Sequence, residues 1–529
     1  MSNVRVLVSD KLAEAGLNVL REAPGVDLEY RPGMNEDELC SVIGDYDGLI
    51  IRSATQVTPR VIEAATNLKA VGRAGIGVDN VDIPAASRRG IVVMNTPTGN
   101  SVTTAEHALA LLASLARKIP QAVASMREGK WEKSKFQGRE IAHKTLGIIG
   151  LGNIGRIVAN RAKGLKMKVI GVDPVMSSDR AAKLGIELVS LDELLERSDF
   201  ITIHAPLTPE TNKLISDAAF DKMKEDALLV NAARGGIVDE EALARAIEQG
   251  KIAGAALDVF GKEPVDPDSP LLKLDNVLCT PHLGASTSEA QERVAVEIAE
   301  QVSAYLQNGL VKNALNVPTL PPEIAERLAP YLEVARKLGS VVGQLDPIDV
   351  RELRVTCTGE AGELGVTPIA RAALAGFLEH HLEEPINPIS APYEAQERGI
   401  RLAEVKEASH RYSAEVRVTV TGERGTHTAT GTPGRKGEPR LVDLEGLEID
   451  AVLQGSVILM RNLDRPGVIG AVGTLLGNLD INVSQMQLGL DESTGEALAL
   501  YNVDSPVGAD ALGELRKLDN VSSVYNLRL

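Results

Sequence analysis

The chain has 529 residues, of which 44% are hydrophobic and 24% charged, and its formal net charge is −17. Such a length exceeds one hydrophobic core and predicts several domains, and the acidic balance argues against nucleic acid as a main partner. The chain has no apolar run near the roughly 20 residues of a membrane span and no basic-then-apolar leader, and its cysteines form no CxxC pair. These features predict a cytoplasmic globular protein without a membrane partner, a disulfide framework or a metal cluster.

Residues 1–98 predict a compact α/β unit. Its strands are expected at residues 4–9, 48–51, 68–71 and 91–95. Arg52 and Arg73 come just past the ends of two of these strands, where ligands gather in open α/β sheets. We therefore expect both arginines in one anion pocket rather than at a solvated surface. Gly75 and Gly77 would let backbone amides join that pocket.

Residues 100–118 predict a long amphipathic helix that crosses to the next domain, and its His107 is more typical of a packed side chain than of a catalyst. The following loop, residues 127–139, is basic and holds Trp131, the only tryptophan of the chain. A tryptophan on a surface arm usually packs against a partner. We therefore expect the chain to associate with itself, as a dimer or a tetramer.

The stretch TLGIIGLGNIG, residues 145–155, predicts a strand, a glycine-rich turn and the start of a helix. Gly150 permits a sharp turn, Gly152 lets the backbone touch a pyrophosphate, and Gly155 lets helix and strand pack closely. A second strand ends in Asp173, near the spacing of a ribose-binding acid. Its carboxylate would accept both ribose hydroxyls and repel a 2′-phosphate, so the sequence predicts NAD rather than NADP.

From residue 145 onward, strands alternate with helical patterns, which predicts a doubly wound parallel sheet. The strands are expected at residues 146–149, 168–172, 200–203, 227–231, 253–257 and 277–279. Arg234, Asp258, Glu263 and His282 follow the later strands, on the same edge as the glycine turn. His204 also ends a strand there and is expected to pack near the cofactor.

Those side chains match the needs of a dehydrogenase that acts on a 2-hydroxy acid. A histidine can take the hydroxyl proton, a carboxylate can fix its tautomer, and an arginine can hold the substrate carboxylate by two hydrogen bonds. His282, Glu263 and Arg234 provide one of each. Asp258 has two interpretations, a hydrogen bond to the nicotinamide carboxamide or a cap on the next turn.

Five motifs carry a resemblance to a known family: GLGNIG, the pair Asp173-Pro174, NAARGGIVD, DVFGKEP and TPHLGAST. They resemble the D-isomer-specific 2-hydroxyacid dehydrogenases, whose matching Arg, Glu and His form the catalytic set with the His as proton donor. The resemblance covers residues 1 to about 316. It implies a Rossmann-type NAD domain over residues 99–287 and a flavodoxin-like substrate domain made of residues 1–98 and 288–316.

The resemblance also implies ligand contacts. Cofactor contacts are expected at Gly150, Gly152, Asn153, Ile154, Gly155, Asp173, Ala232, Ala233, Arg234, Asp258, His282, Gly284 and Ala285. Substrate contacts are expected at Arg52, Ser53, Arg73, Gly75, Asn100, Arg234 and His282.

The motifs IIRSAT, VGRAGIGVDNVD and NTPTGNSVTTAEH resemble the branch that oxidises 3-phospho-D-glycerate to 3-phosphooxypyruvate at the start of L-serine synthesis. A substrate with a phosphate and a carboxylate needs two cationic anchors, which Arg52 and Arg234 would supply. Glu263 counts against the formate dehydrogenase branch, which carries an amide there. Two alternatives stay open: a glyoxylate, hydroxypyruvate or 2-hydroxyglutarate reductase, and an NAD-sensing corepressor or scaffold that keeps the fold.

Two further domains are expected after a proline-rich linker. Residues 317–453 predict an α+β intervening domain, whose basic residues Arg424, Arg435 and Lys436 fit a solvated loop better than a second anion site. Residues 454–529 predict a ferredoxin-like fold that resembles an ACT domain, either a serine-binding regulator or a purely structural oligomerisation module. The expected effector contacts are Asn462, Asp464, Pro466, Gly467 and, from a neighbouring copy, Asn482.

Overall fold

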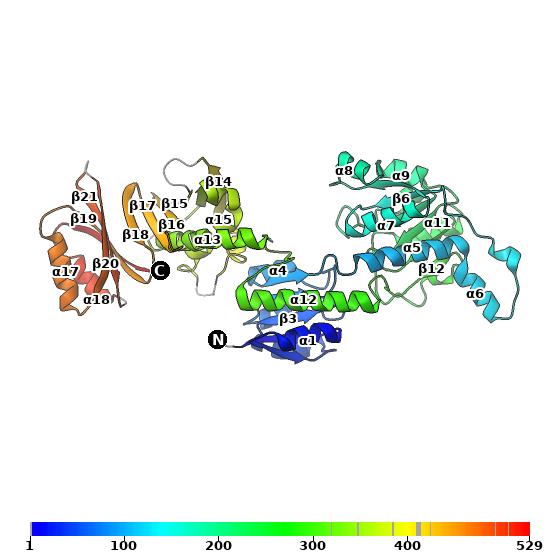
Figure 1. Cartoon of the computed structure of the whole chain (residues 1–529), viewed down its shortest axis with the longest axis horizontal. Helices are drawn as coiled ribbons and strands as arrows, with labels where there is room; N and C mark the ends of the chain where they lie inside the picture. Colours follow the sequence, from blue (N-terminus) through cyan, green and yellow to red (C-terminus); the bar gives the residue numbers. More distant parts are fainter. Residues whose placement is uncertain are drawn as a thin grey trace.

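The computed structural model describes residues 3–318, 320–345, 349–382, 386–408, 414–423, 425–491, 494–505 and 507–529. Four β-sheets with their own helices lie along an elongated molecule, and we number these units in chain order; in space the first unit lies between the second and the third (Figure 1). Arg424, one of the basic residues considered above, lies outside the described residues. None of the helices formed by the described residues has the length and apolar character that a membrane crossing requires.

The first unit is a five-stranded parallel sheet in the order β2-β1-β3-β4-β5, the flavodoxin-like order. Its strands are β1 (Val4–Val8), β2 (Val26–Tyr30), β3 (Gly48–Ile51), β4 (Ala70–Arg73) and β5 (Val92–Asn95). Strand β2 was not predicted, because this edge strand alternates acidic and apolar residues and is only half-buried. The central strands are apolar on both faces, as expected of a sheet covered on both sides.

Helices from two distant parts of the chain cover one face of this sheet. They are α1 (Glu14–Glu22) and α12 (Ser288–Asn308), which follows the second unit in the sequence. The two helices pack closely, because a Cβ at Gly16 would lie 2.6 Å from the carbonyl oxygen of Ala295. The opposite face is covered by α2 (Glu36–Val42), α3 (Pro59–Ala64) and α4 (Ile83–Arg88).

The second unit is a seven-stranded parallel sheet in the order β12-β11-β10-β9-β6-β7-β8. Its strands are β6 (Thr145–Ile149), β7 (Lys168–Val172), β8 (Glu187–Leu188), β9 (Phe200–Ile203), β10 (Leu228–Asn231), β11 (Gly254–Leu257) and β12 (Val277–Cys279). Six of these strands were predicted, and the two-residue edge strand β8 was not. The predicted Rossmann-type class is confirmed.

Two hydrophobic clusters hold the helices of the second unit against its sheet. One face carries α5 (Ser101–Arg117), α7 (Asn153–Gly164) and α8 (Ser178–Lys183). The other face carries α9 (Leu191–Arg197), α10 (Asp217–Phe220) and α11 (Glu240–Glu248). The short helix α6 (Ile119–Arg127) extends away from the sheet at the far end of the molecule (Figure 1).

The third unit is a six-stranded mixed sheet in the order β14-β13-β15-β16-β17-β18. Its strands are β13 (Glu352–Thr358), β14 (Arg401–Glu407), β15 (Ala414–Gly422), β16 (Gly425–Pro433), β17 (Pro439–Leu444) and β18 (Leu447–Val452). Helices α13 (Pro322–Gly343) and α15 (Val366–Leu378) pack on one face. Their backbones meet at Gly339 and Gly376, where a Cβ would lie 2.0 Å from a carbonyl oxygen of the other helix.

One loop of the third unit docks on the first. Between α15 and α16 (Ala391–Glu397), Asn387 donates from Nδ2 to the Gly90 carbonyl oxygen at 3.0 Å. Ile389 is 9% exposed and packs in the same cluster as Met94 of β5. The third unit is therefore attached to the side of the first unit that carries α4 and β5.

The fourth unit is a four-stranded antiparallel sheet in the order β20-β21-β19-β22, the ferredoxin-like arrangement. Its elements are β19 (Ser456–Leu463), α17 (Val468–Asn478), β20 (Val483–Asp491), β21 (Glu496–Val503), α18 (Ala509–Leu515) and β22 (Val521–Arg528). One sheet face packs on α17 and α18. The other face, including Leu459, Leu498 and Leu500, joins the hydrophobic core of the third unit.

Candidate active site

The glycine turn after β6 leaves its middle glycine open. Gly150 has φ +91°, and a Cβ there would lie 2.5 Å from the His204 carbonyl oxygen. At Gly155 a Cβ would lie 2.0 Å from the Gly150 carbonyl oxygen, so a side chain would push α7 off the sheet. No atom lies within 4 Å of the corresponding position at Gly152, the N-cap of α7. The turn therefore leaves space for a phosphate beside the free N–H groups of the helix.

Asp173 lies at the end of β7, against that turn. One carboxylate oxygen accepts from the Leu151 N–H at 2.7 Å, and the other accepts from Val175 and Met176 at 2.9 and 3.0 Å. These bonds fix the carboxylate, and Oδ2, which accepts only one of them, retains a lone pair for a ribose hydroxyl. The open glycine turn and this acid fit a dinucleotide.

The other predicted cofactor residues surround the same edge of the sheet. Asn153 donates to the Pro97 carbonyl oxygen at 3.3 Å, and Ile154 packs against the core under α7. Ala232 and Ala233 are buried after β10, and Ala285 lies in the turn after Gly284.

His204, at the end of β9, bonds to the Thr202 hydroxyl at 3.0 Å through Nε2, while its buried Nδ1 has no partner among the described residues. Burial lowers the pKa of His204 to about 3, so this ring is neutral.

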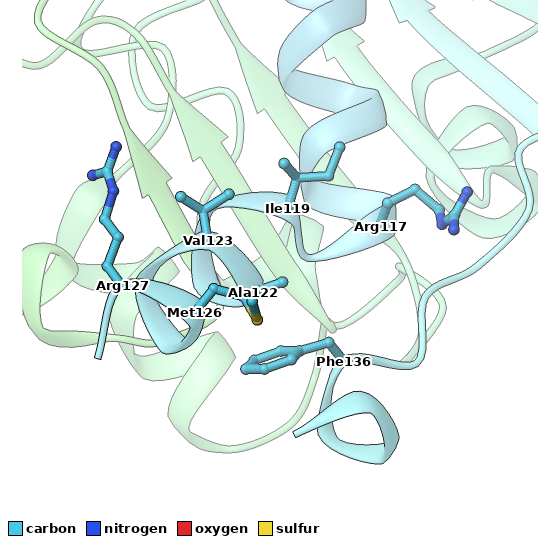
Figure 2. A pocket seen from close by; sticks show the side chains of 7 residues that line it. All are labelled: Arg117, Ile119, Ala122, Val123, Met126, Arg127 and Phe136. Atoms are coloured by element: carbon cyan, nitrogen blue, oxygen red, sulfur yellow. The ribbon is translucent and has the colours of Figure 1, made fainter. Parts of the chain in front are cut away.

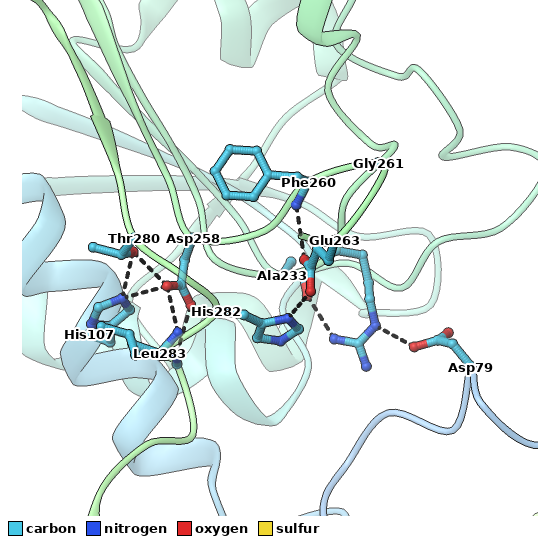
Figure 3. A network of polar contacts seen from close by, with 12 residues as sticks. Asp79, His107, Ala233, Asp258, Phe260, Gly261, Glu263, Thr280, His282 and Leu283 are labelled. Atoms are coloured by element: carbon cyan, nitrogen blue, oxygen red, sulfur yellow. Dashed lines mark hydrogen bonds and ion pairs between the residues drawn. The ribbon is translucent and has the colours of Figure 1, made fainter. Parts of the chain in front are cut away.

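His282 and Glu263 form a direct pair. His282 Nδ1 lies 2.7 Å from Glu263 Oε2, and the second oxygen of Glu263 accepts from the Phe260 N–H at 3.0 Å (Figure 3). The backbone of His282 has φ +54°, and its N–H donates to the Asp258 carbonyl oxygen at 2.9 Å. The ring is half-exposed. Because Nδ1 faces a carboxylate, it carries the proton, and Nε2 keeps a free lone pair.

Asp258 is the buried centre of a second network beside this pair. Its carboxylate accepts from the Thr280 hydroxyl at 2.6 Å and from the N–H groups of Leu283 and Gly284 at 2.7 and 2.8 Å. His107 Nε2 lies 3.1 Å away (Figure 3). Burial alone would raise the pKa of Asp258, but the bonds from His107, Thr280 and Leu283 hold it below the usual range. These contacts fit the interpretation of Asp258 as a cap on the turn that carries His282.

Arg234 follows β10 and reaches the first unit. Its Nε lies 2.9 Å from an oxygen of Asp79, and its Nη1 donates to the Ala233 carbonyl oxygen at 2.7 Å. Figure 3 shows Glu263 and His282 next to Ala233, with Asp79 beyond them on the first unit. A Cβ at Gly77 would lie 1.8 Å from Arg234 Nη2, so this glycine makes room for the guanidinium.

Two more arginines come to this region from the first unit. Arg73 ends β4, and burial, followed by the nearby charges of Arg234 and Arg52, lowers the pKa of Arg73 to about 10. A Cβ at Gly75 would lie 1.6 Å from Arg73 Nη1, and Arg73 Nε has no partner among the described residues. Arg73 is thus close enough to each of the other two arginines for their charges to act on it, which favours an anion beside it.

Arg52 is held by its backbone rather than by its side chain. Its N–H donates to Asp10 at 2.6 Å, and within the described part of the chain its guanidinium donates only to the Lys11 carbonyl oxygen at 3.2 Å. Ser53 follows it. Asn100, the remaining predicted substrate residue, is 9% exposed at the start of α5, and its Oδ1 has no partner among the described residues.

Sequence reasoning missed two carboxylates of this site, Asp10 and Asp79. Asp10 is 4% exposed and also accepts from the Thr55 hydroxyl at 2.9 Å, so it clamps the loop that carries Arg52. It comes directly after the strand region predicted at residues 4–9, the same signal that identified the two arginines. Asp79 lies in a loop and has no comparable signal.

The predicted effector residues lie in the fourth unit. Asn462 is 4% exposed on β19, and its Oδ1 has no partner among the described residues. Asp464, Pro466 and Gly467 lead into α17, with Gly467 at the N-cap and φ +99°. Asn482 lies beyond the other end of α17, where its N–H lies 3.3 Å from Asp504. Within one chain the structure thus separates Asn482 from the other four.

Three family descriptions match successive parts of the chain. Residues 109–284 match the NAD binding domain of D-isomer specific 2-hydroxyacid dehydrogenases. Residues 327–445 match the D-3-phosphoglycerate dehydrogenase intervening domain, and residues 456–520 match the ACT domain. The protein is therefore an oxidoreductase of the NAD-binding 2-hydroxyacid dehydrogenase class.

Relatives that match nearly the full length of the chain show which family within this class it belongs to. The chain is 44% identical to the D-3-phosphoglycerate dehydrogenase of Synechocystis, over 99% of this chain and 95% of that protein. It is also 44% identical to the enzyme of that name from Archaeoglobus fulgidus, over 98% of each chain. The chain belongs to the D-3-phosphoglycerate dehydrogenase family.

Two solved structures match about three fifths of the chain. A D-lactate dehydrogenase from Aquifex aeolicus complexed with NAD and lactic acid has a TM-score of 0.54 and 27% identity, and it covers 59% of this chain and 100% of its own. A formate dehydrogenase from Staphylococcus aureus in complex with NAD has a TM-score of 0.54 and 31% identity, and it covers 60% of this chain and 100% of its own.

Proposed function

We propose that the protein oxidises 3-phospho-D-glycerate to 3-phosphooxypyruvate with NAD as acceptor, the reaction that commits carbon to L-serine. The observation that carries this proposal is the pair of His282 and Glu263 at 2.7 Å, on the sheet edge that also holds the open glycine turn and Arg234. Arg52 and Arg73 supply cations for a phosphate at the other end of the substrate.

The reaction needs one proton acceptor and one carboxylate clamp. His282 Nε2 would take the proton of the substrate hydroxyl, while Glu263 stabilises the positive charge that the ring then carries. Arg234 would hold the substrate carboxylate and orient the adjacent carbon. When bound, NAD supplies the acceptor for the hydride that leaves this carbon. The NAD molecule would be held by Gly150–Gly155, Asp173 and the N-terminus of α7.

The first test is NADH formation from 3-phosphoglycerate, with and without serine. We expect turnover with the phosphorylated acid and less of it when serine is present. Absence of turnover with this acid, together with turnover of glyoxylate or 2-oxoglutarate, would favour another member of the same class.

Arg52→Ala distinguishes the phosphorylated substrate from a smaller acid. Loss of a charged anchor should lower kcat/KM for 3-phosphoglycerate by about 100-fold, because the phosphate loses its partner. Reduction of glyoxylate, which has no phosphate, should change less than threefold. Equal losses on both acids would contradict the assignment of Arg52 to the phosphate.

We also propose L-serine as the effector of the ACT domain. Asp464 is suited to the ammonium group, and the N-terminus of α17 is suited to the carboxylate. Because Asn482 lies beyond the opposite end of α17, it would complete the site only from a neighbouring copy. Binding of serine to Asp464→Ala, measured by calorimetry, should be lost, and unchanged binding would contradict this placement.

We propose that the protein forms a dimer or tetramer through α6 and the arm that follows it. Ile119, Val123 and Met126 of α6 line a hollow of about 550 Å³ with Phe136 (Figure 2). Their exposed fractions are 48%, 42% and 55%, and Trp131 nearby is 80% exposed. Such an apolar surface fits a second copy of the chain. Val123→Glu should shift the mass measured by light scattering toward the monomer.

The domain limits that we propose are residues 1–98 with 288–316, 99–287, 317–453 and 454–529.

We also propose a cytoplasmic location, since the three cysteines, Cys40, Cys279 and Cys357, are free thiols.

A further inference from the structure

Asp79 makes an ion pair that crosses from the first unit to the second. Its Oδ2 accepts from Arg234 Nε at 2.9 Å. The Asp79 side chain is 72% exposed and the Arg234 side chain 29% exposed. An ion pair so open to water contributes little to stability, on the order of 0–1 kcal/mol. A role in folding therefore does not account for its position.

The loop that carries Asp79 is held rigidly although its side chain is exposed. The next residue, Asn80, donates from Nδ2 to the carbonyl oxygens of Arg52 and Thr55 at 2.8 and 2.7 Å. The Val57 N–H donates to the Asn80 carbonyl oxygen at 2.8 Å. The carboxylate is thus presented from a fixed backbone, and it is fixed to the same loop that carries Arg52.

The contacts that Arg234 makes with the described residues leave one edge of the guanidinium without a partner. Asp79 occupies Nε, and the Ala233 carbonyl oxygen occupies one N–H of Nη1. The remaining N–H groups are on Nη1 and Nη2, the edge that can bind a carboxylate by two parallel hydrogen bonds. Without Asp79, the Nε edge would be free as well, and a carboxylate could bind at either edge.

Asp79 also offsets the repulsion among the arginines. Arg73 is partly buried and feels the charges of Arg234 and Arg52, and Asp79 is one of the two acids, with Asp10, whose charges act on it most strongly. The like charge of Arg73 would turn the Arg234 side chain away unless a carboxylate held it in place, and Asp79 is that carboxylate.

We propose that Asp79 is a positioning residue that holds Arg234 from across the domain boundary, so that only its Nη1–Nη2 edge faces the substrate carboxylate. This inference rests on the proposed function for the identity of the substrate. Because the carboxylate belongs to one unit and the guanidinium to the other, the correct edge is presented only when the two units are together.

The test compares Asp79→Asn, Asp79→Ala and Asp79→Glu in the full-length protein. We expect the Asn and Ala variants to lose about tenfold in kcat/KM for 3-phosphoglycerate, mainly through a higher KM, because the carboxylate binds in mixed orientations. Glu keeps the charge and should recover part of the loss. NADH affinity, measured by fluorescence, should stay within twofold of the unsubstituted protein.

A control variant and a variant of Arg234 distinguish a role of Asp79 in positioning Arg234 from a role in stabilising the fold. Asp226→Asn removes an exposed carboxylate paired with Arg139 at 2.8 Å, far from this site, and should leave the kinetics unchanged. In an Arg234→Lys background, which lacks Nε and the planar edges, Asp79→Asn should add less than a twofold change to the dissociation constant of 3-phosphoglycerate in the presence of NADH.

Two results would overturn the inference: kinetics of Asp79→Asn within twofold of the unsubstituted protein, or an equal cost of Asp79→Asn with Arg234 and with Lys at that position. If the unsubstituted protein does not oxidise 3-phosphoglycerate, the proposed substrate is wrong. The same Asp79 series on whichever 2-hydroxy acid is turned over would then still test the positioning role, since that acid also carries a carboxylate.

Discussion

The first two units meet through polar side chains, whereas the intervening and ACT domains share one hydrophobic core. Across the first boundary, Arg234 contacts Asp79, and Asn153 donates to the Pro97 carbonyl oxygen. Among the described residues, the hydrophobic clusters of the first unit contain no residue of the NAD-binding sheet. Across the last boundary, a single cluster contains Leu338 of α13 together with Leu500 of β21.

The boundary between the first two units can therefore open, whereas opening the boundary between the intervening and ACT domains would cost much more free energy. Polar contacts at a surface exchange for water or ligand at little cost, so the first two units can move relative to each other around a substrate. Separating the last two would expose side chains such as Leu459 and Leu498, at about 25 cal/mol for each Å² of apolar surface. We therefore expect the intervening and ACT domains to move as one body.

The largest effect should come from His282→Ala, which removes the proton acceptor that we propose at the polar boundary. We expect kcat to fall by about 10³- to 10⁴-fold, or about 4–5 kcal/mol of barrier. NADH affinity and the unfolding temperature should stay near their original values. Loss of NADH affinity equal to the loss of rate would contradict the role of His282 as base, and unchanged function in vivo would favour the corepressor alternative.

Leu500→Ala tests the shared core. The side chain is fully buried in the cluster common to both domains, and its loss should cost about 3 kcal/mol of the free energy of unfolding. Hydrogen exchange should speed up in α13 as well as in β21. Leu476→Ala is the control, because Leu476 is equally buried between α17 and the ACT sheet alone. If Leu500→Ala leaves α13 protected, the two domains are separate bodies.

Gly77→Ala tests the polar boundary without removing a charge. The new Cβ would overlap Arg234 Nη2, which is the end of a flexible side chain, so the fold should remain and the guanidinium should move. A shift of about 1 Å in a substrate-holding group can cost about 100-fold in rate, or close to 3 kcal/mol of barrier. Steady-state kinetics with an unchanged unfolding temperature would support this account, and unchanged kinetics would contradict it.

The smallest effect should come from Glu445→Gln, at the polar margin of the shared core. Glu445 lies 2.6 Å from His427 Nδ1 and also pairs with Arg461 of β19. The hydrogen bond from His427, and then the charge of Arg461, lower the pKa of Glu445 against the opposing effect of burial. We expect a loss of about 1 kcal/mol in the free energy of unfolding at pH 7.

The pH dependence gives this prediction its sign. Because the folded pKa lies below the unfolded value of about 4.3, the stabilisation is complete above that value and disappears as the pH falls through the folded pKa. Denaturant unfolding of the two proteins should therefore differ at pH 7 and converge as the pH falls through the lowered pKa of folded Glu445. Glu423→Gln, which removes an exposed partner of Arg351, should change stability by less than half as much.

The sequence predicts most of the fold because its central strands are short apolar runs between glycine and polar turns. Edge strands escape prediction, as at β2 and β8, since one side of them faces water. The glycine turn, Arg234 and His282 stand out because each follows a strand at the same edge. Asp79 does not, because an acid in a loop resembles any solvated charge. The apolar residues on both faces of β19 and β21 indicate that both faces are covered. They do not indicate that the intervening domain is what covers the second face.

The hydrogen bond from Asn387 to the Gly90 carbonyl oxygen determines which part of the enzyme a movement of the C-terminal domains would reach first. It ties the C-terminal body to the half of the active site that carries Arg52, Arg73 and Asp79, while the NAD-binding sheet lies at the far end of the molecule (Figure 1). If the ACT domains of two chains associate, as an effector site completed by a neighbouring copy would require, a movement there would be transmitted through the intervening domain to the unit that carries Arg52 and Arg73. The cofactor side would receive it last, through contacts that yield easily.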